Sequence, residues 1–417
     1  MSLVVPSTLK SWLEVAPDSH FPIQNIPFGL ACLPDNSEGV VTRIGDFVID
    51  LSELAAEGLI PDGEFPVLDS MIELDLDDLR RLRALLVSLF SEENPSLRDN
   101  PALREAAIFR AHEVEMLVPM EIPQFADFYA GIHHASNVGK MFRPDMPPLL
   151  PNYRHLPVGY NGRSSSVVPS EVEIIRPNGQ TKPADSDSPV FGPSKEMDFE
   201  LELGFFIGEG NEMGEAIPIG EAEDHIMGVV LVNDWSARDI QRWEYQPLGP
   251  FLAKSFATSV SPWIVMYDAL SPFKIAGMKQ EPEPLPHLRS DKRHHFDIIL
   301  EVSIQTPSMS QPQVISQSNS KYLYWNFAQM VAHLTSNGTP IEPGDLYASG
   351  TISGPDEGTF GSMLELAWRG TKPVKMVETG EERTFIEDGD TVILSGYCQG
   401  DGYRVGFGQL SNTVVGS

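Results

Sequence analysis

Apolar residues in the first hundred-odd positions recur with the spacings of a hairpin and of two helices. Val40–Leu51 contains two short apolar runs around Gly45-Asp46, a pair typical of a hairpin turn. Four leucines between positions 79 and 89 share one helical face after Asp75, which is a suitable helix cap. Asn100-Pro101 predicts the start of another helix, with proline in its first turn. This part of the chain therefore reads as a small structural unit without chemistry of its own.

The pattern changes after a proline-punctuated joint that extends from Val118-Pro119 to Ile122-Pro123. Beyond it, few long helical patterns intervene between short apolar runs of β type, so we expect mainly β structure rather than a doubly wound α/β sheet. Ser271–His295 is rich in proline and charge and predicts a surface excursion. We expect an N-terminal domain over residues 1–118 and a second over 119–417. The runs that predict strands are Phe199–Ile207, Met227–Val232, Phe296–Ile304, Asp345–Ser349 and Thr391–Ser395.

Composition and charge narrow the class of protein. The 417 residues are 41% hydrophobic, enough for a sizeable core, and the formal net charge of −30 opposes binding to nucleic acid or to an anionic membrane. No apolar run approaches the roughly 18 residues that a spanning helix needs, and we expect no secretory signal. Only Cys32 and Cys398 are present, so disulfides do not organise the fold and a reducing cytoplasm is expected.

A first candidate for chemistry is the acidic segment Asp198–Glu202. If it forms a strand, Asp198, Glu200 and Glu202 point to one side and the apolar residues between them to the other. One interpretation is a solvated acidic face. The other is a buried strand, favoured by the apolar residues Phe205–Ile207 that follow, and buried like charges require a cation. The spacing leaves both interpretations open.

Two further segments carry polar groups after apolar runs. Asp234 follows an apolar run and is placed to open a helix, on which it would share a face with Arg238 and Gln241. A surface ion pair explains the same spacing. Lys254-Ser255 resembles the end of a phosphate-binding loop, but Leu248 and Ala253 occupy positions that such a loop fills with glycine. For Lys254 itself, snorkelling to solvent is the favoured interpretation and pairing the alternative.

Adjacent histidines supply a candidate base. His133 and His134 lack the cysteine or histidine partners of a zinc site, so a base is the better interpretation. Such a base needs a carboxylate on its second nitrogen, and Glu365, inside an apolar run, is a candidate, although a solvent-facing strand position explains it as well. Asp127, Glu200, Glu202 and Asp234 together form an all-oxygen set of the kind that Mg²⁺ or Ca²⁺ prefers, but spacing alone does not show that they converge.

Motifs throughout the chain, in order, closely resemble those of the fumarylacetoacetate hydrolase family. The resemblance covers nearly the whole sequence, including Trp243–Pro250, a stretch that the wider superfamily usually lacks. Ala253 stands where the family pattern has glycine, and His133 departs from it beside the expected catalytic histidine. The motifs are Asp127–Tyr129, His134–Gly139, Leu156–Tyr160, Asp198–Glu202, Asn233–Gln241, Pro247–Ser255, Ala348–Gly354, Ser362–Trp368 and Gly400–Gly408.

This resemblance implies a fold and a reaction. The expected fold is a small N-terminal SH3-like barrel followed by a C-terminal mixed β-roll or β-sandwich, assembled as a homodimer. The implied reaction is hydrolysis of the carbon–carbon bond of 4-fumarylacetoacetate to fumarate and acetoacetate, the last step of tyrosine and phenylalanine catabolism. Rival hypotheses are an acylpyruvate hydrolase, an oxaloacetate decarboxylase-like enzyme, and a catalytically inactive, metal-stabilised dimer.

The resemblance also implies roles for individual residues. Asp127, Glu200, Glu202 and Asp234 match ligands of a divalent cation, and Lys254 and Thr258 match positions of a second, Mg²⁺-type site. His134 and Glu365 match the pair that activates water, while Arg238, Gln241 and Lys254 match groups that stabilise an oxyanion. The substrate-contacting positions are Tyr129, Arg143, Tyr160, Gln241, Tyr245 and Thr351.

Overall fold

The computed structural model describes residues 4–61, 71, 74–183 and 185–417. Its N-terminal part contains the predicted hairpin, formed by β2 (Glu38–Ile44) and β3 (Phe47–Asp50). The leucine-rich helix is α2 (Leu76–Phe90), and Asp75 caps it by accepting a hydrogen bond from the Asp78 amide. Asn100 caps α4 (Pro101–Ala107) in the same way. These three predictions are confirmed.

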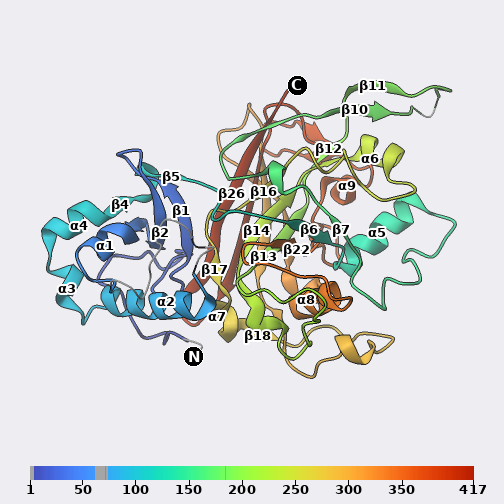
Figure 1. The fold of residues 1–417 in the computed structure, drawn as a ribbon. Helices are drawn as coiled ribbons and strands as arrows, with labels where there is room; N and C mark the ends of the chain where they lie inside the picture. The colour runs from blue at the N-terminus through green and yellow to red at the C-terminus, as the bar shows by residue number, and fades with distance from the viewer. Residues whose placement is uncertain (1–3, 62–70, 72–73, 184) are drawn as a thin grey trace.

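A curled five-stranded sheet forms the body of this N-terminal part, which lies to one side of the molecule in Figure 1. The strand order is β4-β3-β2-β1-β5, and α2 packs its leucine face against this sheet's core. Backbone hydrogen bonds between Phe28 and Ile264 tie the unit to the rest of the chain. The remaining elements are β1 (Phe28–Cys32), α1 (Leu51–Ala56), α3 (Pro95–Arg98), β4 (Ile108–Arg110) and β5 (Glu115–Met116).

An eight-stranded sheet is the frame of the larger part. Its order is β7-β6-β22-β13-β14-β16-β8, with β17 paired to β14 outside this path. The two central strands, β13 and β14, are buried along their whole lengths and are mostly apolar, and their only charged residues are Glu202 and Asp234 of the site. The strands are β6 (Phe125–Phe128), β7 (Gly159–Asn161), β8 (Val167–Val168), β13 (Leu201–Ile207), β14 (Ile226–Asp234), β16 (Thr258–Val260), β17 (Val265–Met266) and β22 (Leu346–Ala348).

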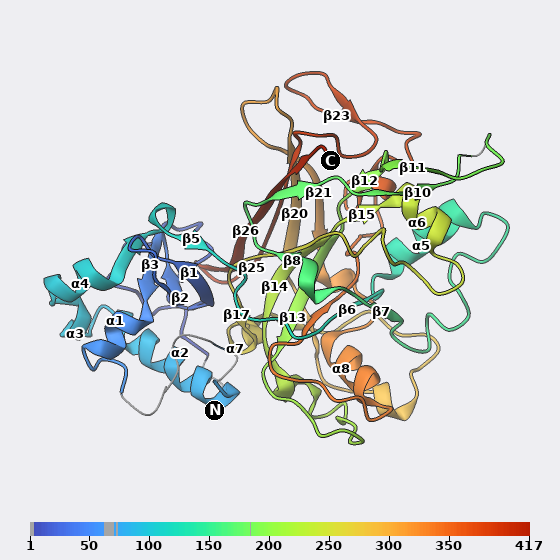
Figure 2. The same cartoon turned by 45° about the horizontal axis from the view of Figure 1, so that its top comes forward.

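A second sheet of five strands packs against β14 and β16, as Figure 2 shows from a second angle. Gly396 of the second sheet lies close to the first, because a Cβ there would come within 3.2 Å of Leu231 Cδ2 on β14. The mainly β prediction is therefore confirmed. The sheet is ordered β21-β20-β25-β26-β9, with bounds β9 (Glu173–Ile175), β20 (Ile299–Gln305), β21 (Gln313–Asn319), β25 (Thr391–Gln399) and β26 (Arg404–Val415).

Short helices cover the open face and the edges of these sheets. The helices α5 (Ile132–Phe142) and α6 (Arg238–Glu244) flank one end of the large sheet, near α9 (Met363–Leu366). Elsewhere α7 (Tyr267–Leu270) and α8 (Phe327–Thr335) pack on the core. A hairpin of β10 (Asn178–Thr181) and β11 (Val190–Pro193) extends away from the body in Figure 1. Within the described ranges, no helix has the length and apolar character needed to cross a membrane.

Candidate active site

Four carboxylates from three separate segments of the chain converge at one end of the central strands of the large sheet. Asp127 lies in β6, Glu202 in β13 and Asp234 at the end of β14, while Glu200 immediately precedes β13. One ligand oxygen from each lies within 4.8 Å of the others. All four side chains are buried, so the solvated acidic face considered for Glu200 and Glu202 is wrong. The convergence that spacing left open is present.

Asp198 is buried as well but has a different task. Its carboxylate accepts a hydrogen bond from Arg238 Nε at 2.7 Å and two more from the amides of Met363 and Leu364 at the start of α9. It lies in β12 (Met197–Asp198), which pairs with β15 (Ser236–Ala237) rather than with β14. Asp198 therefore fixes the orientation of Arg238 and anchors α9, a positioning role that alternation along a strand did not predict.

Asp234 and Lys254 correct two expectations. Asp234 ends a strand instead of opening α6, whose N-cap is Ala237 without a side-chain hydrogen bond. Lys254 does not snorkel to solvent, since it is 5% exposed and pairs with Glu200 and, at 2.8 Å, with Asp234. Thr258, at the start of β16, donates to the other Asp234 oxygen at 2.8 Å. The alternative that Lys254 is paired is the right one, because both partners come from distant strands.

Two of the four acids, Asp127 and Glu202, show a deficit of positive charge, whereas Lys254 and Arg238 lower the pKa of Glu200. Burial and the neighbouring carboxylates raise the pKa of Asp127 and of Glu202 well above the usual values, although Lys254 opposes the shift. Glu202 Oε1 is buried and has no hydrogen-bond partner among the described residues. Like charges held this close in a buried site favour a proton or a cation between them. Oxygen donors of this kind fit a hard divalent cation. The cluster therefore has the all-oxygen composition of a metal site, and Glu202 Oε1 is an oxygen that such a cation could bind.

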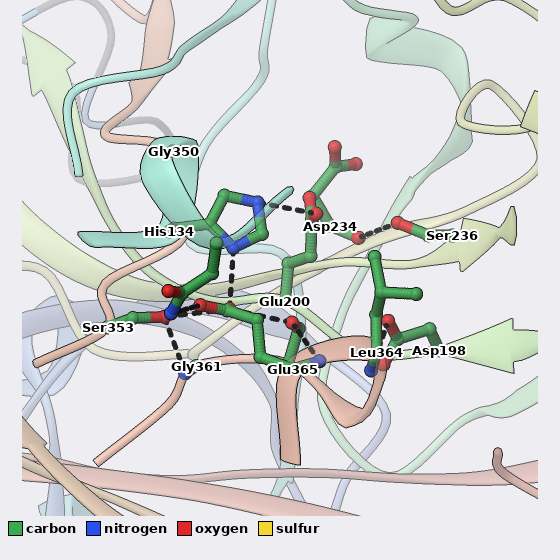
Figure 3. A network of polar contacts seen from close by, with 12 residues as sticks. His134, Asp198, Glu200, Asp234, Ser236, Gly350, Ser353, Gly361, Leu364 and Glu365 are labelled. Carbon is green, nitrogen blue, oxygen red and sulfur yellow. Dashed lines mark hydrogen bonds and ion pairs between the residues drawn. The ribbon is translucent and has the colours of Figure 1, made fainter. Parts of the chain in front are cut away.

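The His134 imidazole bridges the acids and a second carboxylate, as Figure 3 shows. Nδ1 lies 2.6 Å from Glu365 Oε2, and Nε2 lies 3.7 Å from Glu200 Oε1, on the side of the acid cluster. Burial alone would raise the pKa of Glu365, but the charge of His134 and hydrogen bonds lower it. An ionised Glu365 fixes the tautomer with the proton on Nδ1, which leaves Nε2 free to accept a proton. Glu365 lies in the short helix α9 and is buried, so the solvent-facing strand position is wrong.

Three polar side chains hold Glu365 in place. Asn137 Nδ2 donates to Oε1 at 2.9 Å, while the hydroxyls of Ser353 and Ser362 donate to Oε2, each at 2.8 Å. Sequence reasoning missed these positioning residues, although a signal existed for two of them. Asn137 shares a helix face with His134, and Ser362 precedes Glu365 by three residues, the spacing of a capping motif. Ser353 had no such signal, because its contact depends on a loop that returns from β22.

Backbone geometry also serves the site at Gly350. Its amide donates to Asp127 Oδ1 at 3.0 Å and to Glu202 Oε2 at 2.9 Å. Its φ of +77° suits glycine, and a Cβ there would lie 2.3 Å from the Phe128 carbonyl oxygen. Only glycine therefore brings this amide between two of the acids.

A cavity of about 330 Å³ opens from the acids between α5 and α6. It is lined by every position to which the resemblance assigned contact with substrate, and also by Arg242 on α6, which sequence reasoning missed. His133 lies outside this lining and packs edge-on against Tyr322, with ring centroids 5.9 Å apart. His134 is thus the histidine of the adjacent pair that faces the cavity. The assigned substrate positions in the lining are Tyr129, Arg143, Tyr160, Gln241, Tyr245 and Thr351.

Two family profiles match the chain in succession. Residues 24–119 match the profile described as Fumarylacetoacetase N-terminal. Residues 124–415 match the profile described as Fumarylacetoacetate (FAA) hydrolase C-terminal. The second match contains all the residues of the site and its cavity.

Whole-length relatives carry a single name. The chain is 49% identical over 413 residues to the Homo sapiens protein named Fumarylacetoacetase, covering 97% of this chain and 98% of that one. It is also 49% identical over 420 residues to the Dictyostelium discoideum protein of the same name, with 98% of each chain covered. Among solved structures, a fumarylacetoacetate hydrolase from psychrophilic Exiguobacterium antarcticum shares the fold, with a TM-score of 0.52 at 17% identity over 94% of this chain and 100% of that chain.

Proposed function

Because this chain belongs to the fumarylacetoacetase family, we propose that it hydrolyses the carbon–carbon bond of 4-fumarylacetoacetate to give fumarate and acetoacetate. This reaction is the last step of tyrosine and phenylalanine catabolism. The observation that carries the proposal is the position of His134, which Glu365 orients from one side while its Nε2 faces the acid cluster in the cavity. The relatives' shared name favours this substrate over acylpyruvates or oxaloacetate.

We propose Mg²⁺ or Ca²⁺ as the cation, held by Asp127, Glu200, Glu202 and Asp234. The donors are all oxygens, and the unpartnered Glu202 oxygen offers a ligand that no described protein group occupies. Lys254 and Thr258 contact Asp234, one of these ligands, and are proposed to orient it within the same centre. When bound, such a cation supplies Lewis acidity toward the substrate's diketone oxygens.

The protein's own groups accomplish the proton transfers. His134 Nε2 removes a proton from water, and the water oxygen forms a bond to the carbonyl carbon of the fumaryl group, which becomes the second carboxylate of fumarate. The carbon–carbon bond then breaks, and its electron pair passes to the acetoacetate carbon as an enolate. The protonated His134 returns its proton to that carbon, so the base is regenerated. Glu365 stabilises the imidazolium between the two transfers because it remains ionised at 2.6 Å.

Negative charge that develops on the attacked carbonyl oxygen needs donors. Arg238, Gln241 and Lys254 line the cavity beside His134 and are the proposed groups. The Arg238 pKa is raised because the charges of Glu200 and Asp198 outweigh its burial, so it remains a cation throughout. A donor of this kind commonly contributes roughly 3–4 kcal/mol to the transition state. Arg143 is proposed to bind a terminal carboxylate through its guanidinium fork.

The test compares His134→Ala with His133→Ala. We expect His134→Ala to reduce kcat by at least about 10³-fold, because the base is lost. The neighbouring His133→Ala should retain wild-type turnover, since that ring packs on Tyr322 outside the cavity lining. Steady-state kinetics follow the loss of diketone absorbance. Turnover by His134→Ala within about tenfold of wild type, an effect under roughly 1.4 kcal/mol, would refute the base role.

We further propose that the protein is a homodimer of the cytoplasm. Large apolar side chains remain exposed on β11 and on the segment after α6, with Phe191 77% and Leu248 96% exposed. A hydrogen bond of 2.7 Å from Trp243 Nε1 on α6 to Gln180 Oε1 on β10, the strand that pairs with β11, links the elements that precede or adjoin these two segments. Such a face is typical of an interface between subunits. Light scattering coupled to size exclusion should give twice the monomer mass of 46.0 kDa, and a monomer at micromolar concentration would contradict the proposal.

A further inference from the structure

One face of α6 carries more than the assigned catalytic groups. Gln241 and Arg242 follow Arg238 by three and four residues, Tyr245 follows Arg242 by three, and all four line the cavity. Arg242 lies one helical turn beyond Arg238, a displacement of about 6 Å along the axis, and so lies farther from the acids at the base of the site. A guanidinium therefore occupies the cavity wall at some distance from the reacting atoms.

The hydrogen-bonding capacity of Arg242 is largely unused. Its Nη2 pairs with the carboxylate of Glu196. Its Nε is buried yet has no hydrogen-bond partner among the residues that the structure describes. A guanidinium has five donors in a planar fork, so this one retains room for a second carboxylate. Its half-buried side chain, 35% exposed, remains accessible from the cavity.

Arg143 is in a similar condition at the end of α5. Its Nη2 donates to the Pro148 carbonyl oxygen at 3.2 Å, and its Nε is buried and has no partner within the described part of the chain. Two guanidinium groups with unused hydrogen-bond donors therefore line the cavity, one at the end of α5 and one on α6. The proposed substrate carries two carboxylates, one at each end. The two guanidinium groups therefore match the two substrate carboxylates in number, in charge and in hydrogen-bonding capacity.

Charge gives a physical reason for the second fork. The chain carries a formal net charge of −30, which repels a dianion at long range. One arginine leaves the second carboxylate of the substrate in this field without a counter-charge. We infer that Arg242 binds the substrate carboxylate that Arg143 leaves free, exchanging its partner Glu196 for that carboxylate, and that it thereby selects dicarboxylate over monocarboxylate diketones. This inference rests on the proposed function and assigns Arg242 to binding rather than to the chemical step.

The test uses fumarylacetoacetate together with two analogues that each lack one carboxylate. The analogue 3,5-dioxooct-6-enoate carries a methyl group in place of the fumaryl carboxylate, and fumarylacetone lacks the acetoacetate carboxylate. We expect Arg242→Gln to raise KM for fumarylacetoacetate about tenfold with kcat within about twofold, because a charge-assisted hydrogen bond is lost from binding alone. Arg242→Lys should recover part of the loss. Glu196→Gln should lower KM, since it removes the competing carboxylate.

Inhibition constants identify the carboxylate. We expect the Arg242→Gln penalty to disappear for one analogue and the Arg143→Gln penalty to disappear for the other. Lys195→Gln removes an exposed positive charge next to Glu196 and should leave KM unchanged. It is the control for the effect that loss of any nearby positive charge has on substrate binding. An unchanged KM in Arg242→Gln, an equal penalty with all three compounds, or loss of both penalties with the same analogue would overturn the inference. Absence of fumarylacetoacetate hydrolysis by the wild type would instead overturn the proposed function.

Discussion

Two glutamates, the half-buried Glu223 and the fully buried Glu202, differ in how their negative charge is balanced. Glu223 accepts a hydrogen bond from Tyr267 at 2.7 Å and one from Lys274 at 2.8 Å, and His294 Nδ1 lies 3.0 Å away. Burial by itself would raise the pKa of Glu223, but these hydrogen bonds lower it from 4.5 to about 2. Glu202 Oε2 accepts a hydrogen bond from the Gly350 amide, its Oε1 has no partner among the described residues, and burial and three other carboxylates raise its pKa.

The difference separates a structural acid from a binding acid. Glu223 has its counter-charges built into the fold, so its ionised form stabilises the protein. Glu202 lacks them, so its ionised form is destabilising until something else supplies positive charge. Stability and function are therefore expected to respond in opposite directions when the two residues are changed.

The largest expected effect is on activity in Glu202→Gln. Removing one of the four proposed ligands should weaken the binding of the cation and reduce kcat/KM by about 10³-fold or more. The same change removes a buried like charge, so the chelator-treated variant should melt at a higher temperature than chelator-treated wild type. Kinetics and thermal melts with and without chelator measure both.

Glu209→Gln is the matched control, because this exposed acid lies just beyond the end of β13. It should change neither property. A Glu202→Gln protein with lower thermal stability than wild type in chelator would contradict the proposed shortage of positive charge.

Glu223→Gln should give the reverse result. A pKa lowered from 4.5 to about 2 corresponds to at most about 3 kcal/mol, and partial exposure of the carboxylate reduces this to about 2 kcal/mol of the free energy of unfolding. Urea unfolding measures the loss, while kcat should stay within about twofold because Glu223 lies outside the cavity lining. The exposed neighbour Glu221 supplies the control, Glu221→Gln, which should leave both values unchanged. If Glu223→Gln had the same free energy of unfolding as wild type, the partners of Glu223 would contribute nothing to stability.

The difference in unfolding free energy between wild type and Glu223→Gln is expected to depend on pH. The folded-state pKa of Glu223 is about 2, below the ordinary value of 4.5, so its stabilisation is present above pH 4.5 and is lost as the pH falls toward 2. The gap in unfolding free energy between wild type and Glu223→Gln should therefore be constant from pH 7 to 5 and fall to about half near pH 3. Urea titrations at each pH measure it. A gap that widens on acidification would reverse the assigned sign.

Tyr267→Phe is expected to have the smallest effect. It removes one donor from Glu223 while keeping the ring that packs edge-on against Phe296, so about 1 kcal/mol of stability should be lost. In the Glu223→Gln background the same change should cost less, because the charge that strengthens the hydrogen bond is gone. Equal losses in both backgrounds would show that the hydroxyl acts independently of the carboxylate.

Local features were predictable from the sequence, and long-range ones were not. The cap at Asp75 and the helix after it follow from residues within one turn of each other, and both predictions are confirmed. Asp234 was wrongly expected to open a helix, because nothing nearby reveals that the strand continues through it. Lys254 was wrongly expected to reach solvent, because its partners lie 54 and 20 residues away in the chain. The resemblance supplied the site assignments that periodicity could not.

The sequence by itself determined several of the strand segments, the caps of α2 and α4, and that oxygen donors, an imidazole and guanidiniums are available. Only the tertiary structure decided that these groups meet. Asp127 pairs in register with Ala348 of β22, and β22 pairs with β13, which in turn pairs with β14. Strand register therefore brings the carboxylates to one end of the central strands. Burial there removes the water that would otherwise solvate them, and this shared desolvation makes the four acids a group that could hold a cation.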